Sequence, residues 1–278
     1  MTIPDTDILQ VNKIFTSPVK LKNFLKENSI YLKKYLGQNF LVDYNIIKKI
    51  IDSMGFKSDD IILEIGAGIG NVTIFYIQNI KFAILIEKDK GLVKILNKII
   101  PGDKAKILHT DFLKIDLNKL LLNNFRPKLF SNLPYNVASQ IIFKIIDNIN
   151  FFDEIYLMVP EILFEKMRAS SGSKNWTRFS VYFQTFAKAY KLFKVGRNSF
   201  FPIPEIDSVF LKIVKLNEPL IPFEKKEDFK NFLKLFFSKR RKKLKNIIKD
   251  EEKFEIDLNK RPEDIEIQEI IKIFNLKT

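Results

Sequence analysis

The chain has 278 residues, 46% of them hydrophobic, which is enough to bury a core in one large domain or in a large and a small one. It contains no Cys and a single His, which excludes disulfides, thiolate metal sites, cysteine nucleophiles and multi-histidine metal sites, so no metal is expected. The formal net charge of +14 favours a polyanionic partner such as nucleic acid, although a bias toward Lys codons gives the same excess.

The N-terminal sequence MTIPDTDILQ contains two acids and no apolar core, which argues against a signal peptide. No run of 18 apolar residues occurs, so we expect no membrane-spanning helix and no membrane partner. A cytoplasmic protein is the resulting expectation. Residues 1–30 are mixed and Lys-containing without a strong period, and they predict an N-terminal extension with some helix.

The middle of the chain alternates between strand and helix patterns. Apolar residues at helical spacing predict a helix at 44–54. Buried strands are predicted within the segments 59–73, 82–89, 104–113, 128–135 and 153–159, with helices at 90–100 and 137–149. Strand–helix alternation is typical of a parallel, doubly wound α/β sheet. Two further strands, at 187–195 and 207–216, are expected to close it as an antiparallel edge pair, which makes seven strands.

The composition changes at 217–229, where two prolines and a run of charges indicate a linker. Beyond it, residues 225–278 have the pattern of a wholly helical region with a strongly basic segment. We therefore predict an N-terminal extension (1–30), an α/β domain (31–216) and a small all-helical C-terminal domain (217–278).

A glycine-rich turn follows the first predicted strand. In EIGAGIG (64–70), Gly66, Gly68 and Gly70 allow the backbone to approach a ligand closely, although a merely tight turn has the same composition. The spacing is neither the G-x-G-x-x-G of dinucleotide-binding enzymes nor a P-loop.

Acidic residues end the next two strands. Glu87 follows the turn at the position where an acid accepts hydrogen bonds from ribose hydroxyls. Asp111 can accept from the exocyclic amine of adenine, while the ring of Phe112 covers the base. Each acid alone could cap a helix, but the ends of three successive strands mark the crevice where such sheets bind ligands. An adenosine without a pyrophosphate fits better than NAD, so S-adenosylmethionine is the predicted cofactor.

The fourth strand ends in the corner SNLPY (131–135). An aromatic amine is a poor nucleophile, because its lone pair is delocalised into the ring. The side-chain oxygen of Asn132 and the carbonyl of Leu133 or Pro134 could accept both N–H groups of such an amine and aim its lone pair at a methyl sulfonium. Tyr135 could stack on the base, and Pro134 stiffens the corner. The alternative is a strand-ending turn with a packed tyrosine.

Together with QNFL (38–41) and RNSFFPIPEIDS (197–208), the segments EIGAGIG and NLPY resemble the ribosomal RNA adenine dimethyltransferases of the KsgA branch, over about residues 31–250. The combination is highly specific, whereas most of these motifs are weak singly. The resemblance implies a Rossmann-like class I methyltransferase domain and a small helical domain. It further implies methylation of the N6 amines of two adjacent adenosines near the 3′ end of small-subunit rRNA, in a pre-30S-like particle. We expect the enzyme to act as a monomer.

The resemblance also implies site residues. The positions that match the family's cofactor site are Asn39, Leu41, Gly66, Glu87, Asp111 and Asn132, and Gln38 lines the same entrance. Phe200, in the family's F-x-P motif, is expected to form a second aromatic wall for the base, opposite Tyr135. A base held between two rings must first leave its stack.

The basic run SKRRKKLKN (238–246) is predicted to lie on a helix of the C-terminal domain. Its central residues are expected to contact RNA phosphates, with a solvated helix face as the alternative. These residues are Arg240, Arg241, Lys242 and Lys243. The chain departs from the family pattern at Gln140, at 159–162 and at 176–180, all outside the cofactor acids and the NLPY corner.

Three other functions share parts of this pattern. Macrolide-resistance relatives methylate large-subunit rRNA, but the FFPIPEIDS segment and the basic C-terminal region favour the small subunit. A non-catalytic ribosome-assembly or transcription factor that binds RNA or DNA would not need an intact Gly66, Glu87, Asp111 and Asn132. A DNA adenine methyltransferase shares a related corner, but it is not expected to carry QNFL and FFPIP.

Overall fold

The computed structural model describes residues 8–33, 36–120, 126–239, 242–246 and 257–277. By packing, the chain divides into two compact units. The first unit comprises Met1–Glu161 with Tyr190–Ile213, and the second comprises Ile162–Ala189 with Val214–Thr278. Because this division places residues 162–189 with the C-terminal segment, the domain boundary at residue 216 stays a prediction.

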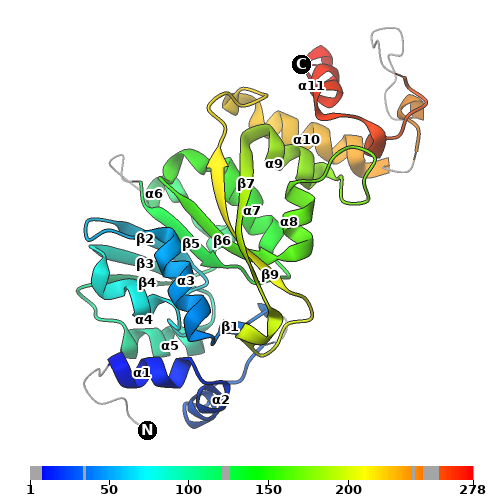
Figure 1. Cartoon of the computed structure of the whole chain (residues 1–278). Helices are drawn as coiled ribbons and strands as arrows, with labels where there is room; N and C mark the ends of the chain where they lie inside the picture. Colours follow the sequence, from blue (N-terminus) through cyan, green and yellow to red (C-terminus); the bar gives the residue numbers. More distant parts are fainter. Residues whose placement is uncertain (1–7, 34–35, 121–125, 240–241, 247–256, 278) are drawn as a thin grey trace. The chain divides into compact units, whose positions relative to one another are not determined.

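The first unit is built around a seven-stranded sheet, whose strands lie side by side in Figure 1. In sheet order the strands are β4 (Ala105–His109), β3 (Phe82–Glu87), β2 (Ile61–Ile65), β5 (Lys128–Asn132), β6 (Ile155–Pro160), β9 (Ser208–Lys215) and β7 (Ala187–Val195). The pairs from β4 to β6 are parallel, and β9 pairs with β6 antiparallel. The predicted mostly parallel, seven-stranded α/β sheet is therefore confirmed.

The central strands are apolar because both of their faces are covered, as is usual for parallel sheets. Ile62, Leu63, Leu85 and Leu129 are all buried. Strand β2 pairs with β3 on one side and with β5 on the other, so the winding direction of the chain reverses there. At such a reversal the connections that follow the two neighbouring strands lead to opposite faces of the sheet, which leaves a crevice for a ligand outside the carboxyl ends of the strands.

Helices flank this sheet (Figure 1). The helices of the first unit that follow the N-terminal segment are α3 (Tyr44–Met54), α4 (Thr73–Tyr76), α5 (Lys90–Ile99), α6 (Leu117–Leu120) and α7 (Ala138–Asp147). The helix predicted at 44–54 is confirmed at both ends. The carboxylate of Asp43 accepts the first free N–H groups, and Gly55 ends the helix in the left-handed conformation at φ 54°.

Two helices form in the predicted N-terminal extension, α1 (Ile8–Phe15) and α2 (Pro18–Glu27). Both pack into the core of the first unit, where Phe15, Leu21 and Phe24 are buried. The rings of Phe15 and Phe24 meet edge to face with centroids 5.7 Å apart. This packing anchors the start of the segment that runs on to QNFL.

A two-stranded antiparallel sheet joins two segments that are far apart in the sequence. It consists of β1 (Phe40–Leu41) and β8 (Phe200–Phe201), with Phe40 opposite Phe201 and Leu41 opposite Phe200. The QNFL and FFPIP motifs are therefore neighbours in space.

The second unit contains the helices α8 (Glu161–Met167), α9 (Arg178–Phe186), α10 (Lys226–Phe236) and α11 (Ile267–Lys277). Aromatic rings hold these helices together. Phe229 of α10 meets Phe274 of α11 with centroids 5.0 Å apart, and it stacks on Tyr182 of α9 at 6.5 Å. In the described part of the chain, no helix is both long enough and apolar enough to cross a membrane.

In the described part of residues 225–278 all regular elements are helical, but the prediction that the basic run lies on one helix is wrong. Helix α10 ends at Phe236. The described residues of the basic run form the end of a 3₁₀ turn at Lys239, a bend at Lys242 and a second 3₁₀ turn at Leu244–Asn246. Clustered like charges three and four residues apart disfavour a helix. The N–H groups of Leu244 and Lys245 donate instead to the carbonyls of Lys260 and Leu258, at 2.9 and 3.1 Å.

Candidate active site

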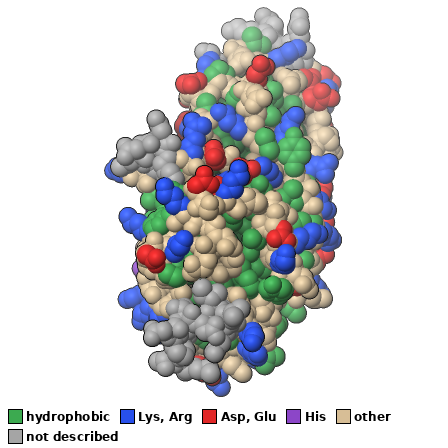
Figure 2. Space-filling model, turned by 60° about the vertical axis from the view of Figure 1, so that its left-hand side comes forward, with side chains coloured by type: hydrophobic (Ala, Val, Ile, Leu, Met, Phe, Trp, Pro, Cys, Tyr) green, Lys and Arg blue, Asp and Glu red, His purple; other side chains and the backbone are tan. Residues whose placement is uncertain are grey.

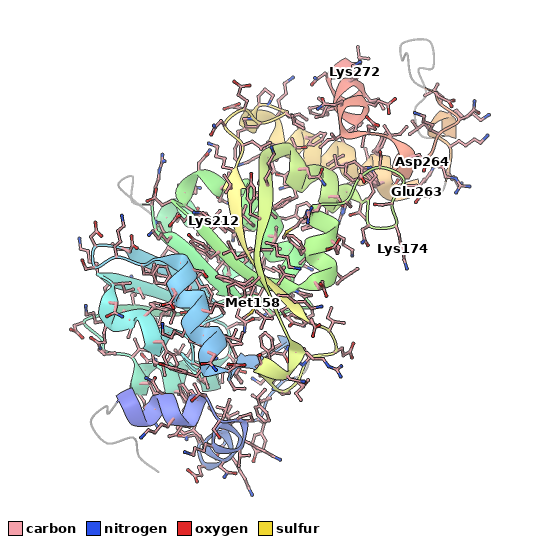
Figure 3. The ribbon with its side chains drawn as sticks, viewed as in Figure 1. Met158, Lys174, Lys212, Glu263, Asp264 and Lys272 are labelled. Carbon is pink, nitrogen blue, oxygen red and sulfur yellow. The ribbon has the colours of Figure 1, made fainter. Side chains whose placement is uncertain are left out.

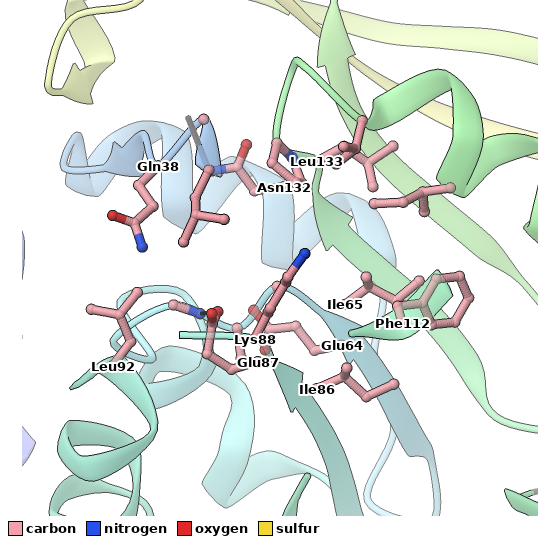
Figure 4. A pocket seen from close by; sticks show the side chains of 18 of the residues that line it. Gln38, Glu64, Ile65, Ile86, Glu87, Lys88, Leu92, Phe112, Asn132 and Leu133 are labelled. Atoms are coloured by element: carbon pink, nitrogen blue, oxygen red, sulfur yellow. Dashed lines mark hydrogen bonds between the residues drawn. The ribbon is translucent and has the colours of Figure 1, made fainter. Parts of the chain in front are cut away.

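A pocket opens in the first unit at the carboxyl ends of the parallel strands (Figure 4). Its cavity volume is about 370 Å³, within the range of roughly 300–1,000 Å³ that is typical of small-molecule sites. Figure 4 shows Gln38 and Asn132 on one side of the cavity and Glu87 on the other. The predicted site residues that line it are Gln38, Asn39, Gly66, Gly68, Glu87, Asp111, Phe112, Asn132, Leu133 and Pro134.

The glycine turn forms the floor of this pocket directly after β2. Gly66 and Gly68 adopt φ angles of 71° and 63°, which residues with a Cβ rarely adopt. A Cβ on Gly68 would come within 3.0 Å of the ring of Phe40, whereas one on Gly66 would meet no atom within 4 Å. Because Gly66 lines the pocket, the absence of its side chain leaves open space for a ligand there.

Glu87 is held rigidly beside this turn. Its Oε2 accepts the N–H of Gly68 at 2.9 Å, and its Oε1 accepts the N–H of Asp89 at 2.7 Å. Burial raises the pKa of Glu87, and the hydrogen bonds from the N–H groups of Asp89 and Gly68 oppose that rise. A carboxylate offers about four acceptor positions, so Glu87 can still accept from a ligand hydroxyl.

Asp111 stands at the end of β4 and is paired with a cation that also lines the pocket. Its Oδ2 lies 2.8 Å from Nζ of Lys88, and its Oδ1 accepts the N–H of Leu113 at 3.0 Å. Burial alone would raise the pKa of Asp111, but the hydrogen bonds from Lys88 and Leu113 outweigh it, and the pKa is lowered. The carboxylate is therefore held ionised as an acceptor.

The ring of Phe112 lies beside Asp111 at the pocket wall, and Lys144 of α7 fixes the turn that carries it. Nζ of Lys144 donates to the carbonyls of Phe112 and Leu113 at 2.8 and 3.0 Å. The same ammonium lies 5.2 Å from the centroid of the Phe112 ring.

The NLPY corner closes the pocket above β5. Nδ2 of Asn132 donates to the carbonyl of Asn39 at 2.9 Å, which orients the amide and leaves its Oδ1 as the acceptor. The carbonyl of Pro134 accepts the N–H of Val137 at 3.2 Å, so this carbonyl already serves the turn. Leu133 is anchored by its N–H, which donates to the carbonyl of Met158 at 3.0 Å.

Three predicted residues do not line the pocket. Tyr135 is half-buried, and its hydroxyl is hydrogen-bonded to that of Ser208. Burial raises the pKa of Tyr135, and the bond to Ser208 opposes that rise. Phe200 and Leu41 are buried opposite one another in the β1–β8 sheet. The carbonyl of Leu41 accepts a hydrogen bond from Nδ2 of Asn71 at 2.7 Å.

The segment before β1 is fastened across the pocket entrance by Asp89. Nζ of Lys33 lies 2.9 Å from Oδ2 of Asp89, and Nε2 of Gln38 donates to the same oxygen at 3.2 Å. Oε1 of Gln38 accepts the N–H of Lys33 at 2.8 Å. Burial would raise the pKa of Asp89, but its bonds to Lys33, Gly91 and Gln38 lower it.

Glu64, inside β2, is a buried acid at the pocket wall. Its Oε2 accepts the hydroxyls of Thr73, at 2.7 Å, and of Tyr76. Burial raises the pKa of Glu64 to about 7, against the effect of these two hydrogen bonds.

Three residues at or beside the pocket were not predicted from the sequence: Glu64, Asp89 and Lys144. Glu64 had a sequence signal, since an acid within an apolar strand needs a partner. Asp89 stands just before a helical pattern, as an N-cap does, and its carboxylate accepts the N–H of Gly91. Lys144 carried no signal, because only the fold brings α7 to the turn after β4.

The predicted RNA-binding residues belong to the second unit and not to this pocket. Lys242 and Lys243 are exposed. Arg240 and Arg241 lie outside the residues that the structure describes. Nζ of Lys243 donates to Oδ1 of Asn259 at 3.5 Å, which is a weak contact.

The strand order, the glycine turn after β2 and the acids after β3 and β4 define a class I S-adenosylmethionine-dependent methyltransferase. A sequence model of the family described as "Ribosomal RNA adenine dimethylase" matches residues 30–278. The chain belongs to this family, and it is an S-adenosylmethionine-dependent rRNA adenine dimethyltransferase.

Similar proteins agree with this assignment. A "Ribosomal RNA small subunit methyltransferase A" of Borrelia garinii subsp. bavariensis is 37% identical, over 96% of both chains. A protein of the same name from Malacoplasma penetrans is 35% identical, over 91% of this chain and 95% of its own. Among solved structures, a dimethyladenosine transferase from Plasmodium falciparum is 26% identical with a TM-score of 0.66, over 84% of this chain and 97% of its own.

Proposed function

We propose that the enzyme methylates the N6 amines of two adjacent adenosines near the 3′ end of small-subunit rRNA, to give N6,N6-dimethyladenosine. The names of the relatives from Borrelia and Malacoplasma support the choice of the small subunit. The observation that carries the proposed chemistry is the Asn132 amide, which a hydrogen bond to Asn39 orients at the end of β5. This amide presents an acceptor at the pocket where an aromatic amine needs one.

The residues of the pocket fit the adenosyl group of S-adenosylmethionine. We assign Glu87 to the ribose hydroxyls, since two backbone N–H groups already fix its carboxylate. We assign Asp111 to the amine of the cofactor's adenine and Phe112 to the face of that base. Gly66 leaves open space at the wall beside them. When bound, the cofactor supplies an electrophilic methyl group on a sulfonium.

At the end of the pocket that receives the target adenine, Oδ1 of Asn132 and the carbonyl of Leu133 accept hydrogen bonds from the two N–H groups of its amine. The carbonyl of Pro134 is the weaker candidate, because it already accepts the N–H of Val137. Accepting both N–H bonds counteracts delocalisation of the nitrogen lone pair and directs it into the pocket. This contribution is positioning combined with electrostatic stabilisation.

Tyr135 and Phe200 are assigned to the two faces of the flipped target base. The support for Tyr135 is its place in the corner, next to the proposed acceptors, with its hydroxyl tied to Ser208. The support for Phe200 is the β1–β8 pairing, which places its motif beside QNFL. The Phe200 ring is only 1% exposed, so its stacking requires a rearrangement on binding.

We further propose that the substrate is a pre-30S-like particle, in the cytoplasm where ribosomes are assembled, and that the enzyme acts as a monomer. The support for a monomer is that one chain supplies the whole pocket lining.

The proposal is tested by incubating the purified enzyme and labelled S-adenosylmethionine with small or large ribosomal subunits from cells that lack the modification. We expect label only in the small subunit, and primer extension should stop at two adjacent adenosines. Label in the large subunit would instead indicate the macrolide-resistance activity. RNA binding without transfer to either subunit would indicate a non-catalytic assembly factor.

A further inference from the structure

The second unit contains a cationic hollow of about 840 Å³, formed by three segments that are far apart in the sequence. Its lining residues are Gly172, Ser173, Lys174, Ser238, Lys239, Lys242, Arg261, Glu263 and Asp264. Four of these side chains are cations and two are acids, so the hollow carries an excess of positive charge. In Figure 3, Glu263 and Asp264 lie next to the loop that carries Lys174.

One wall of the hollow is held together by hydrogen bonds between the loop before α9 and the turn before α11. The N–H of Gly172 donates to the carbonyl of Glu263 at 2.8 Å. Nε1 of Trp176, a buried side chain, donates to the carbonyl of Ile265 at 3.0 Å. These bonds fix the position of Lys174 relative to Glu263, although more than 80 residues separate them in sequence.

The opposite wall is tied to the same turn by the backbone of the basic run. The N–H groups of Leu244 and Lys245 donate to Lys260 and Leu258, and the Leu244 side chain is buried beneath them. Lys242 is thereby brought to the same hollow as Arg261. The cations gather here because the backbone is fixed, and not because they follow one another along a helix.

The two acids are partly engaged by the turn itself. Oδ2 of Asp264 accepts the backbone N–H of Arg261 at 3.4 Å, and Oε1 of Glu263 lies 3.8 Å from Nη1 of Arg261. The side chains of Lys174, Lys239 and Lys242 are exposed. They can therefore meet a large ligand without losing much solvation of their own.

We propose that this hollow binds the phosphate backbone of the substrate rRNA, with Lys174 and Arg261 as contact residues in addition to Lys239 and Lys242. The inference rests on the proposed function and names a contact surface for that substrate. The lining contains no aromatic side chain on which a base could stack, which favours phosphate contacts over base recognition. On the face seen in Figure 2, Lys and Arg side chains are spread out and interspersed with other side chains.

The test compares Lys174→Gln and Arg261→Gln with a matched control, Lys272→Gln. Lys272 is an exposed lysine of the same unit, on α11, and it does not line the hollow. The probe is a fluorescein-labelled RNA duplex, titrated by anisotropy at several salt concentrations. Log affinity falls linearly with log salt concentration. Each lost phosphate contact should make this negative slope shallower by about 0.7 to 0.9. The affinity ratio of parent to variant should therefore fall about threefold between about 50 and 200 mM salt.

Glu263→Gln should have the opposite effect on RNA affinity, because it removes negative charge from the hollow while keeping the shape of the side chain. We expect tighter RNA binding for this variant. With methylatable subunits, Lys174→Gln should raise KM for the subunit and leave kcat unchanged. Thermal unfolding of each variant shows whether the second unit still folds, and Lys174→Arg should restore the slope.

The outcomes separate this inference from the proposed function. If the parent methylates small subunits while Lys174→Gln and Arg261→Gln keep the parental salt slope, the hollow does not contact RNA and the inference is wrong. Equal weakening in Lys272→Gln would also overturn it, because the effect would then be general charge. If the parent methylates nothing but the slopes fall as expected, the proposed function fails and the contact surface stands. A slope change with a DNA duplex but none with RNA would show a DNA surface and refute the inference.

Discussion

Replacing Glu64 with Gln should change how the stability of this protein depends on pH. The carboxyl of Glu64 is buried, and its pKa in the folded protein is about 7, compared with 4.5 in the unfolded chain. Between these two values the folded state binds more protons than the unfolded state. The free energy of unfolding therefore falls as pH rises through this window.

The magnitude follows from the two pKa values. The difference between 4.5 and about 7 corresponds to about 3 kcal/mol, at about 1.4 kcal/mol per pH unit. Gln has nearly the same shape and keeps an oxygen for the hydroxyls of Thr73 and Tyr76, but it does not ionise. Relative to Glu64→Gln, the parent should lose up to about 3 kcal/mol between about pH 5 and pH 8.

The assay is urea unfolding followed by far-ultraviolet circular dichroism, at about half-unit steps from about pH 5 to pH 8. Trp176 lies in the second unit, so its fluorescence would report on the wrong part of the chain. Glu154→Gln is the control. Burial would raise the pKa of Glu154, but hydrogen bonds from Lys212 and Lys128 lower it below its usual 4.5, so it stays ionised over this range. A pH-independent difference between the parent and Glu64→Gln would refute the reasoning.

Three further predictions concern the site. Asn132→Ala should lower kcat by a factor of roughly 10²–10³ and leave RNA affinity near that of the parent, because it removes a positioned acceptor; unchanged turnover would contradict the assignment. Lys88→Met removes a cation from the pocket and leaves the charge of Asp111 unneutralised. The ratio of the affinities for cationic S-adenosylmethionine and for S-adenosylhomocysteine, which has no net charge, should therefore rise about two- to fivefold by calorimetry. An unchanged affinity ratio would show that Lys88 lies too far from the sulfonium. Ser208→Ala and Tyr135→Phe should each cost about 1 kcal/mol of stability, and the double variant should be no worse than either alone; additive losses in a double-mutant cycle would mean that the two hydroxyls act separately.

Much of the fold could be predicted because its signals are local. Helix α3 has an apolar face, an Asp43 cap and a Gly55 stop in adjacent residues, and its predicted bounds are confirmed. The strands β2 to β6 are apolar runs that parallel sheets require. Where local signals were missing, the prediction failed. The basic run was predicted to be helical, but its backbone bonds to Lys260 and Leu258, which sequence proximity could not indicate.

The first part of the site was predictable for a related reason. In a parallel sheet the carboxyl ends of all strands meet at one edge, so Gly66, Glu87 and Asp111 had to lie together once their strands were assigned. Long-range contacts could not be derived in this way. The pairing of β1 with β8, the bond from Asn132 to Asn39 and the attachment of Lys33 to Asp89 join segments whose separation in sequence carries no distance information.

The amino-acid sequence by itself therefore determined which segments form strands, the glycine turn, and the acids and the amide at the strand ends. Each of these features depends on residues that are neighbours along the chain. Only the tertiary structure decided which side chains share a pocket wall and which are covered. Tyr135 is held by Ser208, the Phe200 ring is buried, and Lys174 and Arg261 line the same hollow. The physical reason is that burial and charge clustering depend on packing between distant segments, which local patterns do not encode.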